Sequence, residues 1–278
     1  MMELTVVITC YNNEKCIEQC LRSVLKQTFT PKEIIVVDDC STDSTVDVVR
    51  QLAQECSSIR LIQNEYNSGP SVGRNRGIME ACTEYVTTLD GDDYYYDENK
   101  LYMEMNLIEK YRSEEKDIIA YSYIYTVAQD GSRRYRKFME PEDYTEGRLT
   151  SRLIAWYRPS TFPRDYCVRR QLIIDAGMYR EDMRLYEDLE LLIRLSTSHE
   201  FFCTRHYGTC YRVSDKGLSS AKLTVHRKVL KELWSEHIND VAGIEKFRTI
   251  LLHVYVSVRE YVSMNVRRIK SVMREKKV

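Results

Sequence analysis

Acidic side chains gather at two points of the sequence, each directly after a short run of apolar residues. Asp38 and Asp39 follow one run, and the string LDGDD places Asp90, Asp92 and Asp93 after another. Three carboxylates so close together repel one another unless a cation lies among them. Carboxylate oxygens suit a hard ion such as Mg²⁺ or Mn²⁺, which commonly also binds substrate phosphates. For LDGDD taken alone, a solvated turn or a helix cap is the alternative.

Residues 9–13 follow the first apolar run of the chain, LTVVIT at residues 4–9, and stand where a glycine-rich phosphate loop would be. The string there is TCYNN, and neither GxGxxG nor GxxxxGKS occurs in the chain, so a dinucleotide-binding fold or a P-loop is not expected. Tyr11 can stack on a base, and Asp39 can accept hydrogen bonds from a base or a ribose. Arg74 lies in a glycine-containing segment before the acidic string. The pattern favours a site that holds a diphosphate through a metal ion.

A second acidic pair, Glu187 and Asp188, begins a predicted helix over residues 187–196. The dipole of a helix favours ionised carboxylates at its first turn. An ionised carboxylate within reach of a hydroxyl can act as a general base. The alternative is a pair of helix-start carboxylates that only stabilise the helix.

Alternating strands and helices must position these residues. Runs of β-branched residues predict strands, and apolar residues at helical spacing predict the helices between them. The predicted strands are residues 4–9, 33–37, 59–63 and 84–89, and the predicted helices are 14–27, 46–55 and 72–81. Asn12 or Asn13 could cap the first helix. This alternation predicts an α/β fold with a mainly parallel mixed sheet flanked by helices, with ligands beyond the carboxyl ends of the strands.

The second half of the chain is less regular. We expect a helix over 100–111 and a strand over 118–127, with a hairpin turn at 129–132 leading to 133–138. A loop-rich stretch follows over 139–166. Beyond it we expect a short strand at 167–168, a helix over 170–176 closed by Gly177, and a strand within 201–213. Residues 224–278 predict two helices broken near Gly243. We therefore divide the chain into a catalytic domain, 1–220, with halves 1–100 and 101–220, and a C-terminal helical extension, 221–278.

Composition excludes several classes of protein. The chain has 278 residues, 43% of them hydrophobic, and a net charge of −1, which argues against nucleic acid as a partner. No apolar run approaches the roughly 20 residues of a spanning helix, and the N-terminus lacks the basic start of a secretory signal. The nine cysteines are odd in number and form no CxxC pair, so we expect reduced thiols in a cytoplasmic protein.

Four strings together carry a family resemblance. They are VVITCYNNEKCIEQCLRSVLKQT (6–28), EIIVVDDCSTDST (33–45), NSGPSVGRNRGI with EYVTTLDGDD (67–78 and 84–93), and the shorter YEDLELLIRL (186–195). The chain resembles a family-2 glycosyltransferase with the A-type nucleotide-diphospho-sugar transferase fold, whose nucleotide-binding half is Rossmann-like. The first three strings span residues 4–100 and are highly specific in combination.

The resemblance implies a metal-dependent, inverting transfer of a sugar from a nucleotide-diphosphate donor, UDP by default, to an acceptor hydroxyl, in cell-surface polysaccharide or glycan synthesis. The partners would be the nucleotide-sugar and a glycan or a lipid-linked acceptor. By the same resemblance, Thr9, Tyr11 and Asp39 would hold the nucleoside, and Arg74 would reach the base or diphosphate. Asp90 and Asp92 would bind the donor, and Asp92 and Asp93 would bind Mn²⁺ or Mg²⁺. Asp188 would be the general base.

The chain departs from the family pattern at two places. Residues 191–196 read LLIRLS, without the Gln and Trp of the QxxRW element of processive members, so we expect transfer of one or a few sugars. Residues 211–214 read YRVS, without the His of a Tyr-Arg-x-His string. Arg212 and Lys216 could supply positive charge to the diphosphate instead, or could belong to an exposed basic loop.

The C-terminal segment is basic. Residues 221–278 hold 13 Lys and Arg against 6 Asp and Glu. Apolar residues from Ile244 to Tyr261 follow a spacing of three and four, which fits a helix packed on its own domain or a homodimer interface. The tail from Arg267 could rest on an anionic membrane as a peripheral contact.

Two other functions are alternatives to sugar transfer. A nucleotidyltransferase would need a glycine-rich loop with basic residues where this chain has TCYNN. A degenerate transferase, acting as a non-catalytic glycan-binding or scaffold subunit, predicts loss of the acidic residues, all of which are present.

Overall fold

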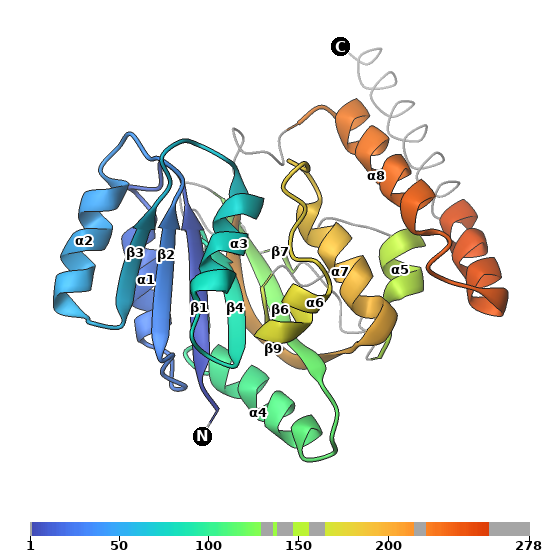
Figure 1. The fold of residues 1–278 in the computed structure, drawn as a ribbon, viewed down its shortest axis with the longest axis horizontal. Coiled ribbons are helices and arrows are strands. Elements are labelled where there is room, and N and C mark those ends of the chain that lie inside the picture. Colours follow the sequence, from blue (N-terminus) through green and yellow to red (C-terminus); the bar gives the residue numbers. More distant parts are fainter. Residues whose placement is uncertain (1, 129–135, 138–146, 156–164, 214–220, 256–278) are drawn as a thin grey trace, which may run out of the picture.

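A computed structural model describes residues 2–128, 136–137, 147–155, 165–213 and 221–255 (Figure 1). A mixed sheet of nine strands runs through the molecule, with the order β3-β2-β1-β4-β8-β6-β9-β5 and with β7 paired to β6. Six strands run in one direction, and β5, β7 and β8 run in the other. The predicted fold class, a mainly parallel mixed sheet flanked by helices, is confirmed.

The N-terminal half is a regular alternation of parallel strands and helices. The strands are β1 (Leu4–Cys10), β2 (Glu33–Asp38), β3 (Ile59–Gln63) and β4 (Tyr85–Asp90), and the helices are α1 (Ile17–Leu25), α2 (Thr45–Glu55) and α3 (Pro70–Glu80). Apart from α1, each lies within two residues of its predicted bounds. The four strands pair in parallel, with β1 between β2 and β4, so their carboxyl ends share one edge of the sheet.

The prediction that Asn12 or Asn13 caps α1 is wrong, because α1 begins later, with Cys16 as its N-cap and no side-chain capping bond. The Asn12 side chain instead accepts a hydrogen bond from the Thr42 amide at 2.8 Å. The Asn13 side chain accepts one from the Tyr11 amide at 3.0 Å. The Asn13 side chain therefore stabilises the loop after β1, and the Asn12 side chain joins this loop to the loop after β2.

The second half contributes the shorter and antiparallel elements. They are β5 (Tyr94–Tyr95), α4 (Lys100–Arg112), β6 (Ile118–Ala128), β7 (Arg136–Lys137), α5 (Thr150–Ala155), β8 (Tyr166–Arg169), α6 (Arg170–Asp175), α7 (Glu187–Ser198), β9 (Glu200–Val213) and α8 (Leu223–His237). The hairpin pairing of β6 with β7 is confirmed; its predicted turn at 129–132 lies outside the described residues. Sequence analysis missed β5 and α5.

Two hydrophobic layers sandwich the sheet. Alternate residues of β1 point to opposite faces: Val6 and Ile8 pack with α1, α2 and α4, whereas Val7 packs with α3, α6 and α7. The approach of α3 to β1 requires a glycine, because a Cβ at Gly77 would lie 2.2 Å from a methyl group of Val7. This packing fixes α3, and hence Arg74, against the strand ends.

A buried ionic cluster of Lys100, Glu104 and Asp165 packs against Tyr95 of β5. The Lys100 ammonium contacts Glu104 at 2.9 Å and Asp165 at 3.0 Å, and it lies 4.6 Å from the centre of the Tyr95 ring. Burial alone would lower the pKa of Lys100, but the two carboxylates raise it well above its ordinary value. The cluster ties α4 to the strand that follows the acidic string.

The C-terminal extension consists of α8 and a second helix that covers residues 243–255 of the described chain. The predicted break near Gly243 is confirmed, with a positive φ of 54° at this glycine. Leu233 of α8 belongs to the same hydrophobic cluster as Leu189 and Leu192 of α7. Among the helices of the described part, none has an apolar stretch long enough to cross a bilayer.

Candidate active site

The carboxyl ends of β1, β2 and β4 bring the acidic segments together. Thr9 lies opposite Asp90 in the register of β1 and β4, and Cys10 lies opposite Asp38 in that of β1 and β2. The Thr9 hydroxyl donates a hydrogen bond to Asp90 at 3.4 Å. A Cβ at Gly91 would lie 2.7 Å from the Cβ of Cys10, so the turn after β4 can pack this closely on β1 only with glycine.

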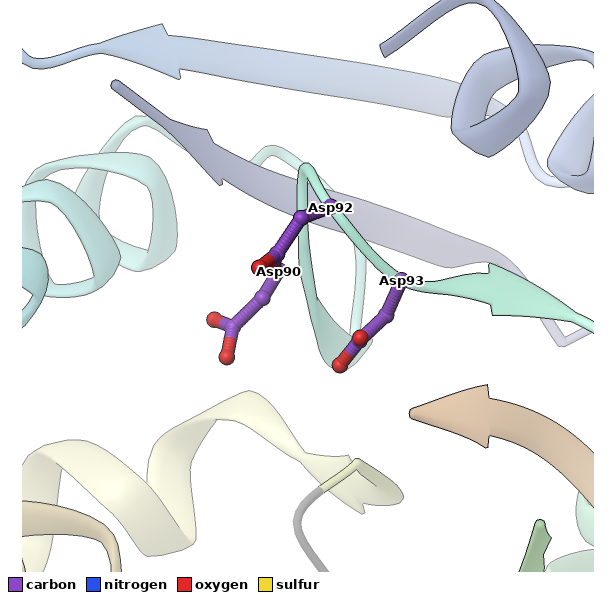
Figure 2. A group of neighbouring side chains, drawn as sticks. All are labelled: Asp90, Asp92 and Asp93. Atoms are coloured by element: carbon purple, nitrogen blue, oxygen red, sulfur yellow. The ribbon is translucent and has the colours of Figure 1, made fainter. Parts of the chain in front are cut away.

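The turn after β4 gathers three carboxylates. It is closed by a hydrogen bond from the Asp93 amide to the Asp90 carbonyl at 2.9 Å. One carboxylate oxygen from each of Asp90, Asp92 and Asp93 lies within 4.8 Å of the other two, and the side chains leave the turn on the same side (Figure 2). An all-oxygen set at this spacing fits Mg²⁺ or Mn²⁺.

Arg212, near the end of β9, packs directly against this turn. Its backbone amide donates to the Asp93 carboxylate at 2.8 Å, and its guanidinium donates to the Asp92 carbonyl at 2.5 Å and lies over the Tyr94 ring. The residue is buried, so the interpretation as an exposed basic loop is wrong. Lys216 lies outside the described residues. A guanidinium therefore already offsets part of the negative charge of the turn.

Arg74 joins the acidic turn to the start of α7. Its guanidinium donates to Asp90 at 2.7 Å and to Glu187 at 2.8 Å, and only 7% of its side chain is exposed. Burial by itself would lower the pKa of Arg74, but the carboxylates of Asp90 and Glu187 raise it well above its ordinary value. These contacts favour a bridging role for Arg74 over a direct contact with the diphosphate.

The start of α7 carries both predicted acidic residues. Burial raises the pKa of Glu187, and the neighbouring charge of Asp188 adds to the rise, against the opposing effect of Arg74. One Asp188 oxygen accepts a hydrogen bond from the Leu189 amide at 2.8 Å, as expected for a carboxylate in the first turn of a helix. Asp188 is partly exposed, whereas Glu187 is buried. Of the two, Asp188 is the one that an external hydroxyl can approach.

The nucleoside residues predicted after β1 and β2 differ in their surroundings. Tyr11 is 47% exposed and can stack on a base. Asp39 is buried, and its carboxylate accepts hydrogen bonds from the amides of Ser68 and Gly69 and from the side chain of Asn64. These three donors form four hydrogen bonds with the carboxylate, because the Ser68 amide is shared between its two oxygens.

The structure thus joins Thr9, Asp90, Arg74 and Glu187 by direct contacts, with Asp92 and Asp93 on the same turn and Asp188 next to Glu187. The predictions for Arg74 and for Glu187 were separate and did not include their ion pair. Arg74 lies one helical turn from the buried residues Ser71 and Ile78, and an arginine at a buried position is the signal that could have indicated a partner of opposite charge.

Comparison with known proteins identifies the family of the chain. The family model described as "Glycosyl transferase family 2" matches residues 5–179, which is more than half of the chain. The chain therefore belongs to glycosyl transferase family 2, and the resemblance noted in the sequence is confirmed. The match ends before α7, so Glu187 and Asp188 lie outside it.

Individual relatives match between 34% and 66% of the chain. The poly(ribitol-phosphate) beta-N-acetylglucosaminyltransferase TarS of Staphylococcus aureus is 41% identical over 97 residues, which are 34% of this chain and 17% of TarS. The GalNAc(5)-diNAcBac-PP-undecaprenol beta-1,3-glucosyltransferase of Campylobacter jejuni is 37% identical over 94 residues, 34% of this chain and 30% of the relative. Among the eight relatives compared, the matches span between 15% and 54% of the relative's length.

Solved structures resemble nearly the whole chain. The crystal structure of S. aureus TarS 1-349 in complex with UDP-GlcNAc aligns with a TM-score of 0.69 and 24% identity, and covers 91% of this chain and 72% of that one. The complex of the same protein with UDP aligns with a TM-score of 0.68. At this identity the likeness establishes the fold, which is that of an A-type glycosyltransferase.

Proposed function

We propose that this chain transfers a sugar from a nucleotide-diphosphate donor, UDP-linked, to an acceptor hydroxyl with inversion at the anomeric carbon. The observation that carries the proposal is the chain of contacts Asp90–Arg74–Glu187, which holds the acidic turn and the start of α7 beside each other. A donor held at the turn then lies next to Asp188. The relatives named above, with a UDP-GlcNAc complex among them, support a nucleotide-sugar as donor.

In this proposal the N-terminal half holds the donor. Tyr11 stacks on the base, and Thr9 and Asp39 contact the nucleoside. Asp90 and Asp92 face the donor, while Asp92 and Asp93 would hold Mn²⁺ or Mg²⁺ beside the diphosphate. When bound, such an ion neutralises the negative charge that develops on the leaving nucleoside diphosphate.

The chemical step is a single displacement. Asp188 removes the proton from the acceptor hydroxyl, and the oxygen of this hydroxyl forms a bond to the anomeric carbon. The bond from that carbon to the diphosphate oxygen breaks at the same time, so the configuration inverts. The absence of the QxxRW element from residues 191–196 supports transfer of one or a few sugars, not polymer extension. The names of the relatives suggest a polysaccharide or a lipid-linked glycan as acceptor.

The test is a donor screen. We expect UDP to raise the melting temperature more than GDP or dTDP, with a larger rise when Mn²⁺ is present, because a ligand that binds only the folded state stabilises it. Asp92→Asn should remove the Mn²⁺-dependent part of the rise. Asp47→Asn, the same change at a side chain that is 81% exposed on α2, is the control. Equal rises for Asp92→Asn and the wild type would contradict the metal assignment.

Transfer itself separates an enzyme from a scaffold subunit. We expect release of UDP from UDP-sugars to depend on an added glycan or lipid-linked acceptor. A protein that binds glycan but releases no UDP with any donor would favour the degenerate-transferase alternative. All acidic residues that the reaction needs are present, which is why we place the enzyme first.

A peripheral membrane contact forms part of this proposal. The helix over residues 243–255 turns its polar Thr249 inward and leaves large apolar side chains 40–68% exposed, namely Ile244, Phe247, Ile250, Leu251, Val254 and Tyr255. Residues 221–278 carry 13 basic and 6 acidic residues. Exposed apolar side chains in a segment whose sequence has an excess of positive charge suit an anionic lipid surface, whereas two copies of so basic a segment would repel each other.

Vesicle sedimentation tests the membrane contact. The protein should sediment with vesicles that contain phosphatidylglycerol and remain in solution with phosphatidylcholine alone. Leu251→Glu should abolish the binding, and Glu245→Gln on the same helix should preserve it. A concentration-dependent dimer that Leu251→Glu dissociates, without binding to either vesicle, would overturn the membrane contact in favour of a homodimer.

A further inference from the structure

The residue directly before the acidic pair of α7 has a backbone conformation that its side chain does not favour. Tyr186 has φ 65° and ψ 20°, in the left-handed region, and serves as the N-cap of α7. For a residue with a bulky side chain this conformation is an outlier and is strained. Such strain persists only where surrounding contacts impose it. Something outside the α7 backbone must therefore hold Tyr186.

The contact that holds it comes from the C-terminal extension. The Tyr186 hydroxyl forms a hydrogen bond of 2.8 Å with Nδ1 of His226 on α8, and the two rings meet edge to face with their centres 5.6 Å apart. Tyr186 is 9% exposed. Burial and the charge of Asp188 raise the pKa of Tyr186 to about 12, so its hydroxyl stays protonated and can donate to His226.

The rest of α8 is anchored on α7 and on the loop that precedes it. Leu233 packs in the cluster of Leu189, His237 faces Glu190, and the Arg180 guanidinium forms an ion pair of 2.9 Å with Glu236. The hydrogen bond that Tyr186 donates to His226 thus joins a fixed helix to the residue two positions before Asp188.

We propose that His226 is a positioning residue: through Tyr186 it fixes the first turn of α7 and with it the direction of the Asp188 carboxylate. This inference rests on the proposed function, because it takes Asp188 as the group that receives the proton. It also gives the extension, which lies beyond the matched family segment, a role in the transfer step. Neither His226 nor the Tyr186 ring needs to contact donor or acceptor for this role.

Three variants test the proposal. His226→Ala and Tyr186→Phe each remove the hydrogen bond, and we expect both to lower kcat about tenfold while KM for the UDP-sugar and the binding of UDP stay unchanged, since a small displacement of a reacting group costs rate without costing donor affinity. His226→Asn can place an amide group near the position of Nδ1 and should restore most of the rate. His253→Ala is the control, because it removes another histidine of the extension, one that stacks on Trp234 of α8.

A second measurement tests the positioning role of His226 independently of the proposed transferase activity. Amide hydrogen exchange over residues 183–190 should be faster in His226→Ala than in the wild type, whether or not a donor has been found. Wild-type exchange in this segment, or a wild-type kcat in both His226→Ala and Tyr186→Phe, would overturn the proposal. Equal losses of kcat and UDP binding would also overturn it, because a purely structural role moves both. Lack of transfer by the wild type with any donor would instead refute the proposed function.

Discussion

The two halves of the molecule build their parts of the site in different ways. In the N-terminal half, the register of parallel strands places Thr9, Asp38 and Asp90 at one edge of the sheet. In the second half, side-chain contacts hold the residues directly before Asp188: the ion pair between Arg74 and Glu187 and the hydrogen bond between Tyr186 and His226. The residues that we propose to bind the donor are thus held by the backbone, and the proposed base is held by a few polar side chains.

The contrast predicts that the two functions can be separated by mutation. Changes in the second half should reduce transfer and leave nucleotide binding intact. Changes at the strand ends should reduce both, since a donor that is not held cannot react.

Asp188→Asn should have the largest effect. Without the base, we expect the transfer rate to fall by roughly 10²–10⁴-fold, while UDP raises the melting temperature as it does in the wild type. The measurements are release of UDP in the presence of acceptor and a thermal shift with UDP. Full activity would mean that another group takes the proton, and loss of UDP stabilisation would place Asp188 on the donor side.

Arg74→Met should break the link between the two halves. It leaves the buried Glu187 without its cation, and removing one partner of a buried ion pair typically costs about 3–5 kcal/mol in the free energy of unfolding. Denaturant unfolding measures this loss. The double variant Arg74→Met with Glu187→Gln should recover part of it, because the uncompensated charge is gone. A loss below about 1 kcal/mol for the single variant would show that the bridge is not important for the fold.

His237→Gln should have the smallest effect, and one that depends on pH. The Glu190 carboxylate, 3.6 Å from Nε2, and then the Asp240 carboxylate, hydrogen-bonded to Nδ1 at 2.6 Å, raise the pKa of His237, while burial opposes the rise. A raised pKa in the folded state means that the stabilisation is complete below the ordinary value of about 6.5 and is lost as the pH rises through the folded value.

At slightly acidic pH, the free energy of unfolding of the wild type should exceed that of His237→Gln by at most about 3 kcal/mol, the upper range for a hydrogen bond to a charged group. This difference should shrink as the pH rises to alkaline values. Urea unfolding of both proteins across this range measures it. A difference that does not change with pH would show that His237 acts on α7 through packing alone.

The fold of the N-terminal half could be predicted from the sequence because its signals are local. Runs such as EIIVV specify buried strands, and the alternation with helices specifies parallel pairing. The strand β5 was missed because two residues are too short for any periodicity to show. The helix α5 was missed because its six residues follow a stretch without a clear pattern.

The site could be predicted in its parts but not in its connections. The acidic string, Tyr11 and the pair at 187–188 are visible as residue types. The ion pair from Arg74 to Glu187 joins positions 113 residues apart, and the contact of Arg212 with Asp93 joins positions 119 apart. No pattern of neighbouring residues specifies such contacts, because they arise only when the sheet brings β4, β9 and α7 together.

The buried cluster of Lys100, Glu104 and Asp165 has a consequence for how this sequence can diverge. A Cβ at Gly208 would lie 2.4 Å from the stem of Lys100 and 2.7 Å from the Cβ of Ser122, so β9 accepts no larger residue there. Among descendants of such a chain, replacement of the lysine by an apolar residue should be inherited together with neutral residues in place of the two acids, whereas position 208 should remain glycine as long as Ser122 is kept. Covariation of positions 100, 104 and 165 would be the record of that constraint.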